Sequence, residues 1–143
     1  MEKYNKVNIM GVYRVSIGNE DLYAVVISCH EWKDLLLPIF IGRFEAIAIQ
    51  TALEKIKMKR PMTHDLIANI LDTIGLAVER VTIDAMVDDL FTATIVLKDE
   101  KGKKWYIDAR PSDSIAIALR TNSPIYVADR LKEYAVPSDN LGI

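Results

Sequence analysis

The chain has 143 residues, of which 50% are hydrophobic and 27% are charged, so it can bury a core without disulfides or a structural metal. Its formal net charge of −2 excludes a protein whose overall field attracts nucleic acid; a polyanion would need a local basic patch, a bound metal or both. The one cysteine, Cys29, cannot form an internal disulfide and is interpreted as a buried structural thiol. Residues 1–10 lack the apolar centre of a signal peptide, and no apolar run approaches a membrane span. We therefore expect a cytoplasmic protein with no membrane association.

Three strands are predicted in the first part of the chain. Spaced apolar residues from Val7 to Ile17 indicate a long strand, and the turn signal Gly18-Asn19 separates it from a second strand, Leu22–Ser28. A third strand is predicted over Asp34–Ile41. Pro38 lacks an amide donor, so this strand is expected at an edge of the sheet or with a bulge.

Two helices are predicted next. The first runs from Arg43 to about Lys57 and ends before Arg60-Pro61, because the residue before a proline disfavours helix. The second runs from about Thr63 to Ile74, with Thr63 as its N-cap and Gly75 as its C′ residue.

The second part of the chain repeats this order. Alternating apolar residues predict strands over residues 80–85 and 91–97, and a third strand covers Lys103–Ala109. A helix is predicted over Pro111–Arg120, a short strand over Pro124–Val127 and a helical turn over Asp129–Tyr134. Residues 1–136 are interpreted as one domain, and residues 137–143 as a loosely held tail.

The two halves also share a local pattern. Residues 39–49 read IFIGRFEAIAI and residues 107–117 read IDARPSDSIAI, which aligns Glu45 with Asp113. The sequence therefore predicts an α+β fold of two βββα-like units, with a mainly antiparallel sheet and packed helices. An internal duplication would explain the match, and chance is the alternative. Residues 44–49 and 115–119 are apolar nearly all round, which favours helices covered on both sides and a homo-oligomer, a dimer or larger.

The segment Asp108–Asp113 carries an unusual density of polar groups. Strand alternation places Asp108 and Arg110 on one face, and Pro111 can begin a helix that has Ser112 and Asp113 in its first turn. Two carboxylates can hold a divalent cation such as Mg²⁺ or Mn²⁺, and Arg110 and Ser112 can bind phosphate. The structural alternative is an Asp108–Arg110 ion pair with Asp113 and Ser112 capping the helix. Glu45, in the first turn of its own helix, is a third candidate ligand.

The segment Arg60–Asp65 again places an Arg-Pro before a helix start. His64 can act as a general base or acid, and Asp65 is a second catalytic candidate that could orient it. Neighbouring residues on a helix do not face each other, so His64 is expected to work instead with Asp108 or Asp113. Arg60 ends a basic run with three lysines at positions 55, 57 and 59 and is a candidate phosphate ligand. The alternatives are a solvated helix end for the basic run, and capping roles for Thr63 and Asp65.

These motifs, in this order, resemble the bifunctional nuclease domain family. The resemblance rests on RPMTHDL at residues 60–66 and DARPSDSIAIALR at residues 108–120, with PIFIG at residues 38–42 and Glu45-Ala46, and it extends over about residues 7–130. Ser114 stands where that family usually has alanine. The resemblance implies a nuclease that acts on both DNA and RNA, and it favours convergence of the two Arg-Pro segments on one surface. It transfers no catalytic residues.

Two functional hypotheses follow. In the first, the protein is a nuclease with little sequence specificity: Asp108, Asp113 and Glu45 hold a metal ion, His64 moves a proton, and Arg60 and Arg110 hold phosphates. In the second, it is a non-catalytic oligomeric binding or regulatory module, and the same motifs are structural ion pairs and helix caps. Trp32, Trp105 and Tyr106 are interpreted as core or sheet-face packing residues, with base stacking as the alternative.

Overall fold

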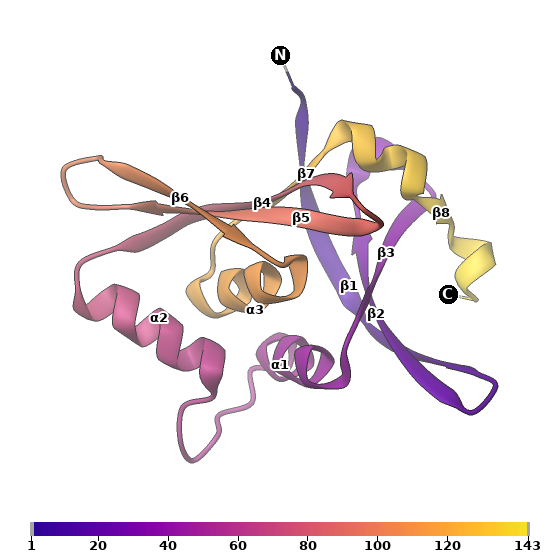
Figure 1. The fold of residues 1–143 in the computed structure, drawn as a ribbon, viewed down its shortest axis with the longest axis horizontal. Coiled ribbons are helices and arrows are strands. Elements are labelled where there is room, and N and C mark those ends of the chain that lie inside the picture. The colour runs from indigo at the N-terminus through magenta and orange to yellow at the C-terminus, as the bar shows by residue number, and fades with distance from the viewer. Residues whose placement is uncertain (1, 143) are drawn as a thin grey trace.

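The structure is a computed structural model that describes residues 2–142, without the side chain of Ile17. Its strands form one eight-stranded sheet in the order β6-β5-β4-β7-β1-β2-β3-β8. Helices α1, α2 and α3 all lie on the same side of this sheet (Figure 1). Among residues 2–142 no helix is long and apolar enough to cross a lipid bilayer.

Each half of the chain folds as three consecutive antiparallel strands followed by a helix. In the first half these are β1 (Tyr4–Ile17), β2 (Glu20–Ser28), β3 (Leu35–Ile41) and α1 (Arg43–Leu53). In the second half they are β4 (Ala77–Val87), β5 (Leu90–Lys98), β6 (Lys104–Ala109) and α3 (Pro111–Thr121). The predicted α+β class and its two βββα-like units are confirmed, while an internal duplication stays a prediction.

The remaining elements join and flank these two units. Helix α2 (Thr63–Thr73) connects them, and β7 (Ile125–Ala128) lies between β1 and β4, antiparallel to the former and parallel to the latter. The short elements are η1 (His30–Trp32), η2 (Asp129–Tyr134), β8 (Val136–Pro137) and η3 (Ser138–Leu141). In the part of the predicted tail that the structure describes, the amide of Ser138 donates to the carbonyl of Asp34 at 3.1 Å.

Helix α3 lies at the centre of the helical layer. Its residues 115–118 are almost completely buried, because the sheet covers one side of the helix while α1 and α2 cover the other. This position explains why α3 is apolar nearly all round. Helix α1 differs, since Phe44 remains 82% exposed and Ile47 44% exposed. The outer face of α1 is therefore uncovered in the single chain.

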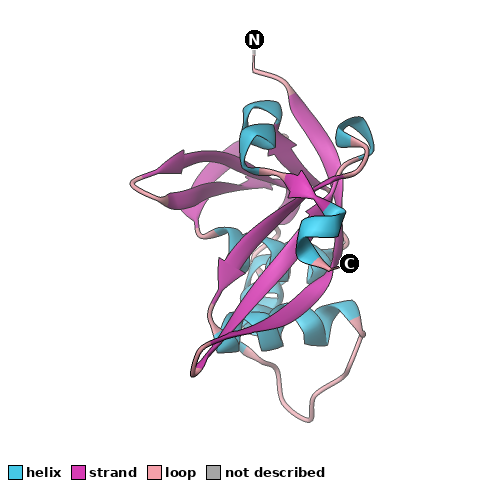
Figure 2. Ribbon diagram, turned by 90° about the vertical axis from the view of Figure 1, so that its right-hand side faces the viewer, coloured by secondary structure: helices cyan, strands magenta, loops and turns pink. Residues whose placement is uncertain are grey.

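Two predicted helix boundaries were wrong. Helix α1 ends at Leu53 and not near Lys57, because Lys55 adopts a left-handed backbone (φ 54°) and the amide of Ile56 bonds back to the carbonyl of Thr51 at 3.1 Å. A left-handed residue at a helix end is usually glycine, so a lysine at this position gave no sequence signal for the end of the helix. Helix α2 has Met62, not Thr63, as its N-cap. Residues 54–62 form a long loop that extends beyond the helices (Figures 1 and 2).

The prediction for Pro38 is confirmed. On one side Pro38 pairs with Val26 of β2, and on the other side the described partner strand β8 pairs only with Leu35 and Leu36. Pro38 therefore lies where β3 is an edge, and its missing amide hydrogen costs no ladder bond.

Candidate functional site

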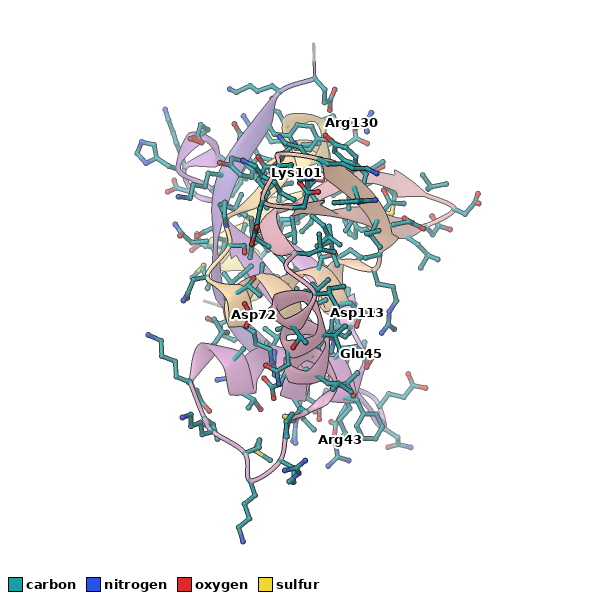
Figure 3. The ribbon with its side chains drawn as sticks, turned by 90° about the vertical axis from the view of Figure 1, so that its left-hand side faces the viewer. Arg43, Glu45, Asp72, Lys101, Asp113 and Arg130 are labelled. Carbon is teal, nitrogen blue, oxygen red and sulfur yellow. The ribbon has the colours of Figure 1, made fainter. Side chains whose placement is uncertain are left out.

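The N-termini of α1 and α3 lie close together, and each carries one of the two acids that the internal sequence match aligns. Glu45 is the third residue of α1 and Asp113 the third residue of α3. Arg110, the N-cap of α3, lies between them. Its Nη1 donates to Glu45 Oε2 at 3.2 Å, its Nε to Asp113 Oδ2 at 2.9 Å and its Nη2 to Asp113 Oδ1 at 3.2 Å. One guanidinium thus joins the two aligned acids, which lie close together in Figure 3.

Helix α2 adds a histidine to the same carboxylate. His64, the second residue of α2, has its Nε2 2.9 Å from Asp113 Oδ1. Its side chain is only 11% exposed. We call His64, Asp113, Arg110 and Glu45 the Arg110 cluster. It connects all three helices, and it brings one residue of the first Arg-Pro segment to two residues of the second.

The electrostatics of the cluster keep Asp113 ionised. Partial burial pushes the pKa of Asp113 up, but hydrogen bonds from Arg110 and His64 outweigh it and leave the pKa below its usual value. The bond to Asp113 in turn raises the pKa of the Arg110 guanidinium. Because an ionised carboxylate can only accept, His64 Nε2 carries the hydrogen of this bond. In the neutral imidazole, Nδ1 is then left as an acceptor.

The Arg110 cluster forms the polar wall of a cleft of about 760 Å³. The apolar part of the lining includes Phe44 and Ile47 of α1, Ile67 of α2 and Ile107 of β6. The Arg110 side chain remains 64% exposed although it contacts two acids. A ligand that enters the cleft can therefore reach the guanidinium without unfolding any element.

Asp65 is held away from His64. Its Oδ2 accepts the backbone N–H of Met62 at 2.9 Å, and its Oδ1 accepts Nε of Arg120 at 2.7 Å. Burial pushes the pKa of Asp65 up, but these two bonds outweigh it and the pKa falls below its usual value. Arg120 is only 7% exposed and also donates to the carbonyl of Ala116 at 3.0 Å. We call Asp65 and Arg120 the Arg120 pair. Arg120 is not among the residues predicted from the sequence, although an arginine in the last turn of a buried helix is a usable signal for a buried ion pair.

Besides Asp65, three predicted residues lie outside the Arg110 cluster. Asp108 is on β6, where it pairs in register with Thr94 of β5, and it lines the cleft. The predicted contact between Asp108 and Arg110 does not form, because Arg110, the N-cap of α3, directs its guanidinium to Asp113 and Glu45 instead. Ser112 is buried and lines a neighbouring pocket, which shares Glu45 and Arg110 with the cleft. Arg60 is exposed in the loop of residues 54–62, together with the three lysines of the basic run.

The arrangement does not fit a divalent metal. Within residues 2–142 no three His, Cys, Asp or Glu side chains come together as a metal site. Of the three carboxylates expected to hold the ion, Glu45 and Asp113 share the guanidinium of Arg110 instead. Asp108 is on the edge strand and makes no hydrogen bond or ion pair with another described side chain. No chemical step is therefore assigned to a metal.

The chain matches known proteins over most of its length. Residues 25–138 match the family described as the bifunctional nuclease domain. An uncharacterized protein of Mycobacterium tuberculosis is 41% identical over 96 residues, which are 67% of this chain and 56% of that protein. Bifunctional nuclease 1 of Oryza sativa subsp. japonica is 32% identical over 111 residues, 76% of this chain and 34% of the relative. Bifunctional nuclease 2 of Arabidopsis thaliana is 27% identical over 122 residues, 84% of this chain and 36% of the relative.

Fold and site together describe an α+β domain with a histidine–carboxylate pair and an arginine at a cleft. The family match covers well over half of the sequence, and the chain belongs to the bifunctional nuclease domain family. It spans about half the length of the mycobacterial relative and about a third of the plant relatives.

Proposed function

We propose that the protein is a nuclease that cleaves phosphodiester bonds of DNA and RNA with little sequence specificity, at the Arg110 cluster. The observation that carries this proposal is the 2.9 Å contact between His64 Nε2 and Asp113 Oδ1 in the wall of a cleft. An imidazole oriented by a carboxylate is the usual arrangement of a general base. The family match supports the class of reaction.

Asp113, His64 and Arg110 each have a defined task in this reaction. Asp113 fixes the imidazole so that Nδ1 of His64 accepts a proton, and it stabilises the imidazolium that results. Water attacks phosphorus as its proton passes to Nδ1, the bond from phosphorus to the leaving oxygen breaks, and that oxygen takes a proton from solvent. Arg110 holds the phosphate oxygens and compensates their growing charge. Asp65 takes no chemical step here, because Arg120 and the Met62 amide already occupy it.

The basic loop supports binding of the nucleic acid backbone. One guanidinium faces two carboxylates in the Arg110 cluster, which leaves excess negative charge when His64 is neutral. Phosphate therefore needs further cations, and Arg60 with the lysines of residues 55–59 supplies them from an exposed loop that enters α2 just before His64. Contacts to phosphates rather than to bases suit a substrate range that includes both DNA and RNA.

The test compares wild type, His64→Gln and Asp113→Asn, purified in parallel and assayed on single-stranded RNA and on plasmid DNA. Both variants should lose about 10²- to 10⁴-fold in kcat, the usual contribution of a positioned base. His30→Gln is the matched control, because His30 is the other histidine of the chain and is exposed on η1. Cleavage at equal rates by all four preparations would mean a contaminating nuclease and would end the catalytic assignment. Parallel reactions with Mg²⁺, Mn²⁺ or a chelator show whether a metal takes part.

A non-catalytic binding or regulatory module is the second candidate. It is favoured by the same contacts, since the Arg110 cluster ties α1, α2 and α3 together without any ligand. In that case Asp113→Asn would lower the melting temperature strongly, and wild type would show no cleavage above the His64→Gln background.

Cytoplasmic location and a homo-oligomer stay predictions. Light scattering of the purified chain measures the oligomeric state, and Phe44→Ser is the variant that should weaken the oligomer.

A further inference from the structure

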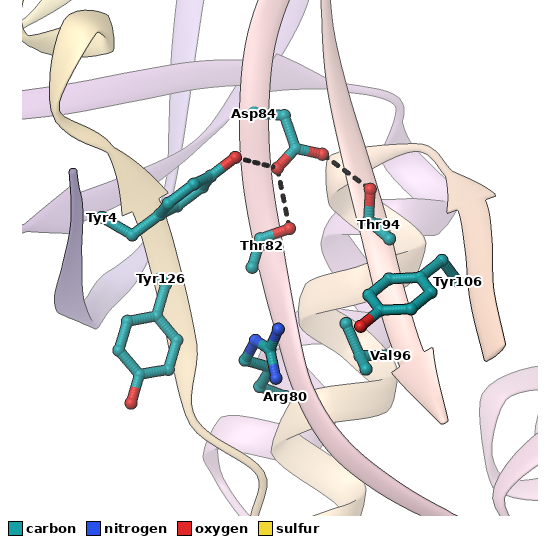
Figure 4. A pocket seen from close by; sticks show the side chains of 8 residues that line it. All are labelled: Tyr4, Arg80, Thr82, Asp84, Thr94, Val96, Tyr106 and Tyr126. Carbon is teal, nitrogen blue, oxygen red and sulfur yellow. Dashed lines mark hydrogen bonds between the residues drawn. The ribbon is translucent and has the colours of Figure 1, made fainter. Parts of the chain in front are cut away.

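The face of the sheet opposite the helices carries a second candidate site. Alternation brings Tyr4 of β1, Tyr126 of β7, Arg80 of β4 and Tyr106 of β6 onto this face, around a pocket of about 560 Å³. Figure 4 shows Tyr4 and Tyr126 on one side of the pocket, Tyr106 on the other and Arg80 between them. The Arg110 cluster lies on the helix side of the sheet. This face is therefore separate from the cleft.

The tyrosines are spaced too widely to enclose a single flat ligand. Tyr106 and Tyr126 lie on strands that are three positions apart in the sheet order β6-β5-β4-β7. At about 4.8 Å between neighbouring strands, their backbones are roughly 14 Å apart. The floor between them is formed by Thr82, Thr94 and Val96. Each ring thus offers its own stacking surface, and Tyr106 is 63% exposed.

Hydrogen bonds hold one wall of the pocket in place. Asp84 Oδ1 accepts the hydroxyl of Tyr4 at 2.8 Å and that of Thr82 at 2.7 Å, and its Oδ2 accepts the hydroxyl of Thr94 at 2.7 Å. Burial and the bond to Asp84 raise the pKa of Tyr4 to about 12, so its hydroxyl remains a donor. The carboxylate of Asp84 is thus occupied by hydroxyl donors, and Tyr4 is fixed before any ligand arrives.

Cations surround this face and give it the charge that a polyanion requires. Lys6 is directly opposite Tyr126 in the sheet, and Lys98 pairs with Lys104 two residues beyond the pair of Val96 and Tyr106. All three lysines are exposed. Glu79 forms ion pairs with Arg80 at 3.1 Å and with Lys104 at 3.0 Å. Lys6 and Lys98 form no ion pair with Glu79. Aromatic rings interleaved with cations on an open sheet are the usual features of a surface that binds single-stranded nucleic acid.

We propose that this open face binds single-stranded nucleic acid, with one base stacked on Tyr106, a second base on Tyr126, and Arg80 holding a phosphate between them. The inference does not depend on cleavage at the Arg110 cluster. A free mononucleotide can fill only one of the two stacking surfaces. A duplex hides the faces of its bases and cannot stack on either tyrosine.

The test is fluorescence anisotropy with a fluorescein-labelled single-stranded DNA octamer, whose integrity is checked on a denaturing gel after each titration. Unlabelled octamer should displace it, whereas an equal nucleotide concentration of mononucleotide or of the blunt duplex should not. Tyr106→Ala should weaken binding about 5- to 150-fold, the usual effect of losing one stacked base, while Tyr106→Phe should bind like wild type. Arg80→Gln should weaken binding and reduce the slope of log K against log salt by about 0.7.

The matched control is Tyr134→Ala, because Tyr134 is an exposed tyrosine on η2 that packs against Phe91 and does not line the pocket. It should bind the octamer like wild type. Wild-type affinity in both Tyr106→Ala and Arg80→Gln would overturn the proposal, as would equal competition by the duplex. Melting curves of each variant confirm that a loss of binding is not a loss of the fold.

Discussion

Two arginines at opposite ends of α3 bind carboxylates in contrasting ways. Arg120, near the C-terminal end, is 7% exposed, and its bonds to Asp65 and to the Ala116 carbonyl lie inside the packed helices. Arg110, at the N-terminal end, is 64% exposed and shares its guanidinium between two acids at the wall of a cleft. Both ends of α3 contact α2, and the residues that α2 contributes, His64 and Asp65, are neighbours in the sequence.

The difference in exposure separates two roles for similar residues. A buried arginine that loses its only carboxylate is left with an uncompensated charge, so the Arg120 pair should matter for stability. An exposed arginine loses little stability when its partner is removed, because water replaces the contact. It remains free to bind an incoming anion. The Arg120 pair is therefore expected to hold α2 on α3, and the Arg110 cluster to act on a ligand.

The largest expected effect on stability comes from Asp65→Asn. Asparagine keeps the size and can still accept the Met62 amide, but it leaves Arg120 buried without a counter-charge. We expect a loss of about 3 kcal/mol in the free energy of unfolding, or about 10 °C in the melting temperature. Denaturant unfolding measures it, with Asp72→Asn as the control, because Asp72 is an exposed acid on the same helix. The kcat per folded molecule should stay at the wild-type value. A drop in kcat without a drop in stability would instead make Asp65 catalytic.

Arg110→Ala should show the reverse pattern. Loss of a charge-assisted phosphate contact should lower kcat/KM by about 10- to 150-fold, while the free energy of unfolding changes by less than about 1 kcal/mol. Arg43→Ala is the matched control, because Arg43 is an exposed arginine in the first turn of α1. Equal effects of the two substitutions on kcat/KM would mean that Arg110 contributes only general positive charge and no specific phosphate contact. A melting temperature as low as that of Asp65→Asn would make it structural.

Low pH should remove the stabilising contribution of both acids. The pKa values of Asp65 and Asp113 are lowered in the folded chain. A lowered carboxyl pKa stabilises the fold fully above the unfolded value of about 3.9, and this contribution disappears as pH falls through the folded pKa. The stability difference between wild type and Asp65→Asn should therefore shrink below about pH 4. Urea unfolding at several pH values from 6 to 2 measures it, and a difference that stays constant would contradict the shift.

Features of the fold and site that depend on local sequence pattern could be predicted from the sequence. Features that depend on chain topology could not. Period-2 alternation predicted the strands, and the aligned segments predicted two βββα-like units, because those signals are local. The contact of His64 with Asp113 depends on how α2 packs on α3, and spacing alone left Asp108 as an equal alternative. Strand alternation grouped Arg110 with Asp108, whereas its guanidinium bonds Glu45 of α1, a contact that depends on how the helices pack. The tyrosines of the open face could not be grouped, because the sheet order that unites them is not local.

The smallest expected effect is that of Glu45→Gln, and it distinguishes a site that binds phosphate through Arg110 from a site that binds a metal ion. Glu45 accepts a bond from Arg110, and its Oε1 would lie 2.8 Å from a Cβ added at Gly42, so the carboxylate is closely fitted against its own helix start. Glu45→Gln removes one negative charge beside Arg110 at almost constant volume. At a separation of about 4 Å such a charge is worth roughly 1 kcal/mol in water, so KM for single-stranded RNA should fall about 5-fold at unchanged kcat. Were Glu45 a metal ligand, the same substitution would instead abolish the activity that Mg²⁺ or Mn²⁺ supports. Steady-state kinetics with each cation and with chelator decide between the two.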